Sequence, residues 1–140
     1  MDDVIRFRST RFRVEPGEDA EINPGIYGRQ LADWLRARLI EAGEAVEPVI
    51  AEDWGRCLMC RRDPFLLWIG CGNESGLAQP ADVPPAAEDI VWICFAAAEV
   101  PLLKRLFVRP DTAPAVDALR RTLLGILAAE PSITRLGDDD

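Results

Sequence analysis

The sequence predicts an α+β fold, a two-layer sandwich in which two long helices cover one face of a mainly antiparallel sheet of about five strands. Two segments carry apolar residues at helical spacing, and the chain between them alternates short apolar stretches with turn residues. Consecutive strands joined by tight turns pair antiparallel, and two amphipathic helices suffice to cover one face of such a sheet. The predicted order of elements is β-α-β-β-β-β-α, within a single domain over residues 1–137.

The first predicted strand spans residues 4–14, and its apolar residues do not share one face. Ile5 and Phe7 have one parity in a strand, whereas Phe12 has the other. We therefore expect a bulge or bend near residues 9–10. The arginines of this segment line the opposite face, which is predicted to be solvated: Arg6, Arg8, Arg11 and Arg13.

The first predicted helix begins at Pro24 and ends at Gly43. Asn23 is a suitable N-cap, and the fixed φ and missing N–H of proline suit the first helical position. Glycine is a common C-terminal stop because it adopts positive φ without strain. Apolar residues recur at helical spacing along this segment and form one stripe: Tyr27, Leu31, Trp34, Leu35, Leu39 and Ala42.

The second predicted helix spans residues 113–129, or begins one residue earlier, and a short edge strand follows over residues 133–136. Pro114 lies in the first turn, where proline is tolerated. Gly125 lies in the helix interior, where glycine costs about 1 kcal/mol relative to alanine. We therefore expect Gly125 to mark a close contact between this helix and the sheet.

The chain between the two helices predicts four strands, over residues 45–50, 54–61, 65–71 and 89–97, of which the second and third form a hairpin. The third is apolar on both faces, which predicts a central strand or one covered on both sides. Residues 73–88 contain three prolines and show no period, so we expect a long surface loop. Residues 101–107 predict a short helix, and residues 138–140 an acidic disordered tail.

The composition excludes several classes of chemistry. The chain of 140 residues contains no histidine, which rules out a Ser-His-Asp triad, a Cys-His pair and histidine-ligated zinc. Its net charge of −8 weighs against nucleic acid as a partner, because duplex binding depends on a basic face. The longest apolar stretches fall short of the roughly 20 residues that cross a bilayer, and the N-terminus is acidic. We expect a cytoplasmic protein without a membrane partner.

The four cysteines are then expected to be reduced thiols. Cys57 and Cys60 have the C-x-x-C spacing of some zinc and redox sites, but residues three apart on a strand point to opposite faces. Buried, inert thiols are favoured over a zinc site formed by all four cysteines. The sequence therefore predicts no metal and no cofactor.

Two short segments are unusually dense in functional residue types, namely residues 52–55 (EDWG) and residues 67–73 (LWIGCGN). If the hairpin pairs Arg61 with Phe65, Gly55 lies opposite Cys71 and the two segments form one surface. Glycines at strand ends allow another backbone or a ligand to come close. The candidate binding surface consists of Glu52, Asp53, Trp54, Trp68, Cys71 and Asn73.

No catalytic residue is predicted on this surface. The carboxylates near Cys71 would raise the pKa of its thiol, whereas a nucleophile needs a lowered pKa. Glu52 and Asp53 are neighbours in an extended segment, so their side chains diverge and cannot form a convergent acid–base pair.

Three strings in residues 16–73, GIYGRQLADWL, EDWG and PFLLWIGCGN, resemble a group of small bacterial proteins of uncharacterised function. The resemblance covers less than half of the chain, and the last string is the most distinctive. It implies a shared α+β fold and supplies neither an activity nor a catalytic residue.

The leading hypothesis is a small acidic protein that binds another, basic protein, as an immunity-type inhibitor, an antitoxin-like partner or a secretion chaperone would. Strong negative charge steers association with a basic partner, and the chain lacks the residues for common catalysis. The alternatives are a small-molecule or metal-binding protein that uses the surface of residues 52–55 and 70–73, and a thiol or carboxylate enzyme. The sequence does not predict the oligomeric state.

Overall fold

The computed structural model describes residues 4–15, 17–18, 26–74, 86–102, 106 and 110–137. Its elements follow in the order β1 (Ile5–Ser9), α1 (Arg29–Glu41), β2 (Ile50–Glu52), β3 (Gly55–Arg61), β4 (Leu66–Asn73), η2 (Ala87–Asp89), β5 (Trp92–Glu99), α3 (Ala113–Ala128) and β6 (Ile133–Arg135). The strands form one antiparallel sheet with the order β2-β3-β4-β5-β1-β6. The predicted α+β class is confirmed, with six strands in place of about five.

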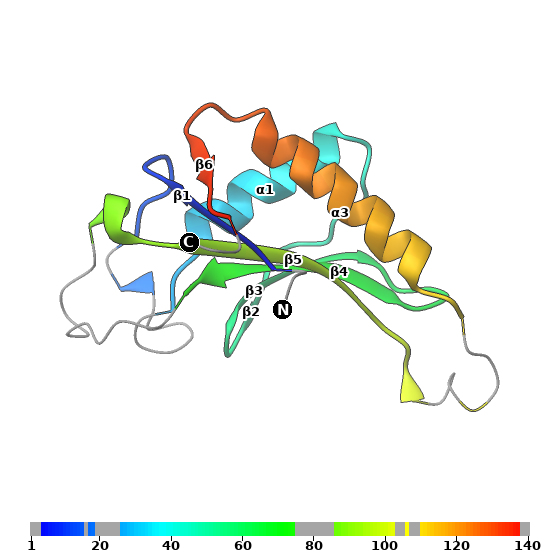
Figure 1. The fold of residues 1–140 in the computed structure, drawn as a ribbon. Helices are drawn as coiled ribbons and strands as arrows, with labels where there is room; N and C mark the ends of the chain where they lie inside the picture. The colour runs from blue at the N-terminus through cyan, green and yellow to red at the C-terminus, as the bar shows by residue number, and fades with distance from the viewer. Residues whose placement is uncertain are drawn as a thin grey trace.

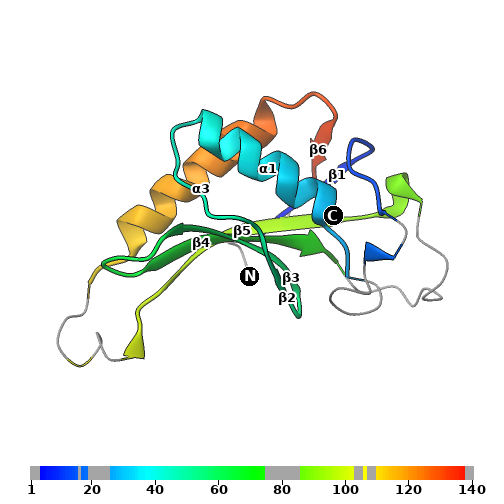
Figure 2. The same ribbon diagram turned by 180° about the vertical axis from the view of Figure 1, so that it is seen from behind.

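Helices α1 and α3 lie side by side on the same face of the sheet (Figures 1 and 2). Their apolar stripes pack against alternate residues of the central strands, and together these side chains form the core. The core includes leucines of both helices and apolar residues of the strands and of the turn after β1: Leu31, Leu35, Leu39, Leu119, Leu123, Leu127, Ile5, Phe7, Phe12, Leu58, Ile69, Cys71, Trp92 and Cys94. No described element covers the opposite face of the sheet (Figure 2).

Strand β4 is central, as predicted, because β3 and β5 flank it. Strand β1 lies between β5 and β6, so the N-terminal strand is internal and the C-terminal strand forms an edge. The two edge strands, β2 and β6, are three residues long each. Edges this short offer few unpaired backbone groups to another strand.

The start of α1 differs from the prediction. The helix begins at Arg29 rather than at Pro24, and Asn23 and Pro24 lie outside the described residues. Gly28 precedes the helix with a φ of 140°, which is incompatible with a helical turn. The predicted stop is confirmed, because α1 ends at Glu41 and Gly43 follows with a φ of 98°.

The strand predicted over residues 45–50 is wrong except at its last residue. Arg36 of α1 donates hydrogen bonds to the carbonyl oxygens of Val46 (3.0 Å) and Glu47 (2.9 Å), so a side chain takes acceptors that a sheet ladder would need. Pro48 has no N–H to contribute to a ladder. Strand β2 therefore begins only at Ile50.

The predicted bend in the first segment is confirmed. Strand β1 ends at Ser9, and a turn brings Phe12 back into the core, where its ring centroid lies 5.2 Å from that of Trp34. Arg11 lies beyond the strand, with an ion pair to Glu130 (3.4 Å). The predicted stripe of four arginines therefore does not form on one strand face.

The structure contradicts the predicted close contact at Gly125. This residue is exposed on α3, and a Cβ built on it would meet nothing within 4 Å. The apolar stripe of α3 places Leu123 and Leu127 in the core, which turns residue 125 toward solvent.

We therefore expect Gly125→Ala to raise the free energy of unfolding by about 1 kcal/mol, because alanine lowers the entropy cost of a helix interior. Gly43→Ala is the matched control. It also meets nothing within 4 Å, but its φ of 98° is strained for alanine, so it should destabilise. Urea denaturation of the two variants checks this, and destabilisation by Gly125→Ala would contradict it.

Several predicted segments fall wholly or largely outside the described residues. They include residues 75–85 of the predicted loop, the tail over residues 138–140 and most of the short helix predicted over residues 101–107. Within the described ranges, no helix combines the length and the hydropathy that a membrane crossing requires.

Candidate functional site

The face of the sheet opposite the helices is apolar over four neighbouring strands. The register places Ile50 beside Cys57, Cys57 beside Gly70 and Gly70 beside Phe95 in one row across β2, β3, β4 and β5. The next row contains Met59, Trp68 and Ala97. We call this side of the sheet the open face; it consists of Ile50, Trp54, Cys57, Met59, Leu66, Trp68, Gly70, Ile93, Phe95 and Ala97. Of these residues, Trp54 is exposed, Cys57, Met59 and Gly70 are buried, and the others are half-buried.

Three rings of the open face pack against one another, and we call Trp54, Trp68 and Phe95 the aromatic cluster. Their centroids are 5.7 Å (Trp54–Trp68), 5.7 Å (Trp54–Phe95) and 5.6 Å (Trp68–Phe95) apart. Trp54 is 40% exposed, and the other two rings are half-buried. Because the rings fill the space between their own centroids, the cluster offers a continuous apolar surface rather than a cage around a cation.

Gly70 supports the aromatic cluster from below. A Cβ at this position would lie 2.4 Å from Cζ of Phe95 and 2.9 Å from Cη2 of Trp54. The two rings therefore lie directly over the glycine backbone, which is the close approach that a glycine within a strand permits.

Four of the six candidate residues lie on or beside the open face: Glu52, Asp53, Trp54 and Trp68. Glu52 is opposite Gly55 at the end of β2, and its charge contributes to the raised pKa of the Cys57 thiol on the open face. Both carboxylate residues are exposed. They form an acidic border next to Trp54, Glu52 at the end of β2 and Asp53 in the turn that joins β2 to β3.

The sheet separates the other two candidates, Cys71 and Asn73, from this surface. Cys71 is 0% exposed and faces the helices beside Cys94 of β5. The carboxamide oxygen of Asn73 accepts a hydrogen bond from the backbone N–H of Tyr27 (2.8 Å). The predicted register is one residue off, because Arg56 rather than Gly55 pairs with Cys71 and the ladder shifts between Met59 and Arg61.

The glycines at the strand ends are in contact with the chain's own backbone. A Cβ on Gly55 would lie 2.5 Å from the carbonyl oxygen of Cys71, and one on Gly28 would lie 3.3 Å from Cα of Gly72. The turn before β3, the end of β4 and the start of α1 thus meet at three glycines. The sequence left open whether these glycines admit a ligand or another part of the backbone. In the structure, close packing of the backbone accounts for them.

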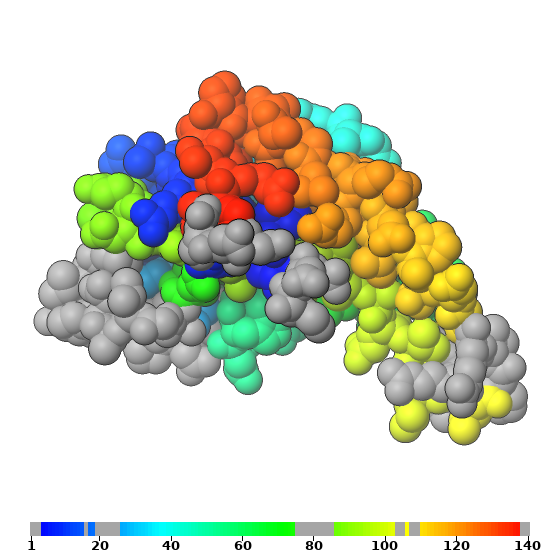
Figure 3. Space-filling view, viewed as in Figure 1, coloured from blue at the N-terminus to red at the C-terminus, as the bar shows by residue number. Residues whose placement is uncertain are grey.

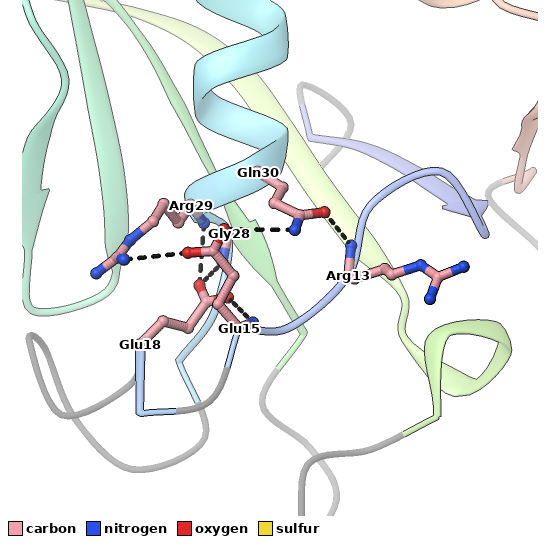
Figure 4. Close-up of polar contacts among 6 residues, drawn as sticks. All are labelled: Arg13, Glu15, Glu18, Gly28, Arg29 and Gln30. Atoms are coloured by element: carbon pink, nitrogen blue, oxygen red, sulfur yellow. Dashed lines mark hydrogen bonds and ion pairs between the residues drawn. The ribbon is translucent and has the colours of Figure 1, made fainter.

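A buried carboxylate that the sequence analysis missed holds the start of α1 (Figure 4). Glu18 is 1% exposed. Its Oε2 accepts hydrogen bonds from the N–H groups of Gly28 (3.1 Å) and Arg29 (3.0 Å), and its Oε1 accepts one from the N–H of Glu15 (2.7 Å). Because Glu18 lies in a loop well before the helix, no local capping motif signals it. Its oxygens are engaged in capping, so we assign it a structural role.

The thiols are poorly suited to nucleophilic catalysis. Burial raises the pKa of Cys71 to about 12 and that of Cys60 to about 12. Burial, and then the charge of Glu52, raise the pKa of Cys57 to about 11. Burial also raises the pKa of Cys94 well above its ordinary value. All four groups are neutral thiols near pH 7.

This ionisation behaviour predicts a loss of stability in alkali. A thiol of the unfolded chain ionises near 9.0, whereas Cys71 in the folded protein ionises only near 12. The stabilisation is complete below pH 9 and is lost as the pH rises toward 12, by about 1.4 kcal/mol per pH unit. Unfolding free energies between pH 9 and 10.5 should fall more steeply for the wild type than for Cys71→Ala. Rapid alkylation of folded Cys71 at pH 7 would contradict this expectation.

The described residues contain no group of three or more Cys, Asp or Glu side chains placed to hold a metal ion. As predicted, Cys57 and Cys60 diverge: Cys57 lies in a row of the open face, and Cys60 packs against the core under the helices.

In comparisons with known proteins, no family model matches the chain, and no curated protein or solved structure is significantly similar to it. The resemblance to a group of small bacterial proteins stays a prediction.

Proposed function

We propose that this protein acts by binding another protein, and that the open face is its binding surface. The observation that carries the proposal is the aromatic cluster, which lies on the side of the sheet that no described element covers (Figure 1). Tryptophan and phenylalanine are enriched at the centres of protein interfaces, and contiguous exposed apolar surface is a mark of interaction sites. The sheet faces the helices with one side and presents the cluster with the other.

The charge of the chain favours a basic partner over a second copy. Each molecule carries a net charge of −8, so two copies repel each other at long range, whereas a basic protein is attracted. Glu52 and Asp53 place part of this charge beside Trp54. An inhibitor of a basic toxin or a chaperone for a basic secreted protein would use a surface of this kind.

Two alternatives find less support in the geometry. For a small-molecule site, the glycine positions that would admit a ligand are packed against the chain's own backbone. For a thiol or carboxylate enzyme, Cys71 is fully buried with a raised pKa, and Glu52 and Asp53 lie exposed at a turn.

The test is capture of a partner by tagged protein in its native cell, with two matched variants. Trp54→Glu places a charge in the aromatic cluster, and Ile40→Glu places one at a similarly exposed apolar residue of α1 (Trp54 40%, Ile40 47%). We expect wild type and Ile40→Glu to capture the same stoichiometric basic protein and Trp54→Glu to lose it, with all three equally folded by circular dichroism. Equal capture by Trp54→Glu, or no stoichiometric protein with the wild type, would refute the proposal. A wild-type dimer that Trp54→Glu dissociates would refute the basic partner in favour of a second copy.

A further inference from the structure

The dimensions of the open face restrict what fits on it. Its apolar rows span four strands, which is about 14 Å at the usual strand spacing, and residues 66–70 of β4 extend about 13 Å along the strand. On β1, the next strand, the corresponding positions are Arg6 and Arg8, and Arg6 forms an ion pair with Glu74 (2.9 Å). The apolar surface thus ends at β5. It is wide enough for one α-helix, whose diameter with side chains is about 10–12 Å, and about ten helical residues would cross it.

Backbone hydrogen bonding favours the same occupant. The middle of a sheet face offers side chains but no free backbone donors or acceptors, so an extended peptide lying there would bury its own polar groups unpaired. A helix satisfies its backbone internally. Strand addition would instead use a sheet edge, and both edge strands are only three residues long.

The charged residues at the border of the open face indicate which polar side chain a docked helix would carry. The β2–β3 turn projects from the sheet on the side away from the helices, and its atoms lie at the lower edge of the molecule in Figure 3. It carries Glu52, Asp53 and the exposed ring of Trp54. None of the ion pairs found among the described residues involves Glu52. A guanidinium stacks on a tryptophan face and pairs with a carboxylate at the same time, which an ammonium does less well.

We propose that the partner docks on the open face through a short amphipathic helix, with an arginine beside its apolar stripe that contacts Trp54 and pairs with Glu52. This inference rests on the proposed function and specifies the chemistry of the partner. The apolar stripe lies on Trp68, Phe95 and the aliphatic residues around them.

Four synthetic peptides of 14 residues serve as probes: a leucine/arginine amphipathic helix, its leucine/lysine and leucine/glutamate counterparts, and a leucine/arginine peptide with strict alternation. Affinity is measured by calorimetry and peptide helicity by circular dichroism. We expect the leucine/arginine helix to bind about tenfold more tightly than the leucine/glutamate helix and the alternating peptide, and about threefold more tightly than the leucine/lysine helix. It should gain helicity on binding.

The protein variants assign these preferences to residues. The double variant Glu52→Gln, Asp53→Asn should weaken binding of the leucine/arginine helix about three- to tenfold and, because like-charge repulsion is removed, should strengthen binding of the leucine/glutamate helix. Trp54→Glu should abolish binding of all the peptides, and Ile40→Glu should change none. Equal affinity for the helical and alternating peptides, or an unchanged preference for arginine in the double variant, would overturn the inference. If either result is found but Trp54→Glu still loses the native partner, the proposed function stands, and only the inference that the partner docks through an arginine-bearing helix is wrong.

Discussion

Replacing Glu18 with alanine should lower the free energy of unfolding by about 3–4 kcal/mol, more than a typical point substitution. The carboxylate is 1% exposed and accepts three backbone hydrogen bonds, two of them from the first N–H groups at the start of α1. Hydrogen bonds to a charged group contribute about 1.5–3 kcal/mol each, and alanine would leave buried donors without an acceptor. Because helix α1 contributes many residues to the core, losing the hydrogen bonds at its start should lower the stability of the whole domain.

Glu15→Ala is the matched control for this prediction. Glu15 is a carboxylate of the same loop, but its side chain is 39% exposed and its ion pair with Arg29 (3.0 Å) is open to solvent. Removing such a pair costs about 1 kcal/mol or less. Glu18→Gln, which keeps one acceptor oxygen, should fall between the two. Urea denaturation followed by circular dichroism ranks the three variants, and a cost for Glu18→Ala no larger than that for Glu15→Ala would contradict the assigned role.

The elements that were predicted correctly carry their signals within their own residues. Helix α3 has its proline in the first turn and its leucines at helical spacing, and it spans Ala113–Ala128. The β3–β4 hairpin was also identified, because two apolar runs flank a short turn. The stop of α1 at Gly43 needs only positive φ, which glycine provides. Local propensity and long-range packing agree at these places.

The errors arise where a distant residue decides the local structure. Helix α1 starts at Arg29 because Glu18 binds the first amides, and the chain over residues 45–49 is not a strand because Arg36 takes its carbonyl oxygens. Neither contact follows from local spacing. Gly125 was misjudged because a glycine in a helix has two explanations, close contact or simple exposure, and the sequence does not separate them.

The candidate site was half predictable for a similar reason. Trp54 and Trp68 were identified because a short turn joins β3 to β4 and limits their register. Phe95 was missed, because the connection between β4 and β5 is long and does not define the register between them. Cys71 was wrongly placed beside the two tryptophans. The apolar strand β4 alternates between two faces, and only the position of the helices distinguishes the core from the open face.

Replacing Gly55 with alanine should destabilise the fold by about 3 kcal/mol or more and should also displace Trp54. The new Cβ would lie 2.5 Å from the carbonyl oxygen of Cys71, a backbone atom that cannot move without disturbing the β3–β4 ladder. The φ of 157° adds strain, because residues with a Cβ rarely adopt it. Trp54 is the next residue back along the chain, so a shift of this turn moves its ring away from Trp68 and Phe95.

Gly70→Ala separates the effect on the fold from the effect on the open face. Its Cβ would meet the ring atoms of Phe95 at 2.4 Å and of Trp54 at 2.9 Å, and side-chain rings can rotate away where a backbone carbonyl cannot. We expect a loss of about 1–2 kcal/mol for Gly70→Ala, with partner binding reduced as strongly as in Trp54→Glu. Urea denaturation measures the loss of stability, tryptophan emission reports displacement of the Trp54 ring, and capture of the partner measures the loss of binding. If Gly55→Ala lowers the free energy of unfolding no more than Gly70→Ala does, the close packing of Gly28, Gly55 and Gly72 does not hold the β2–β3 turn in place. The position of Glu52 and Asp53 beside Trp54 would then depend on other contacts.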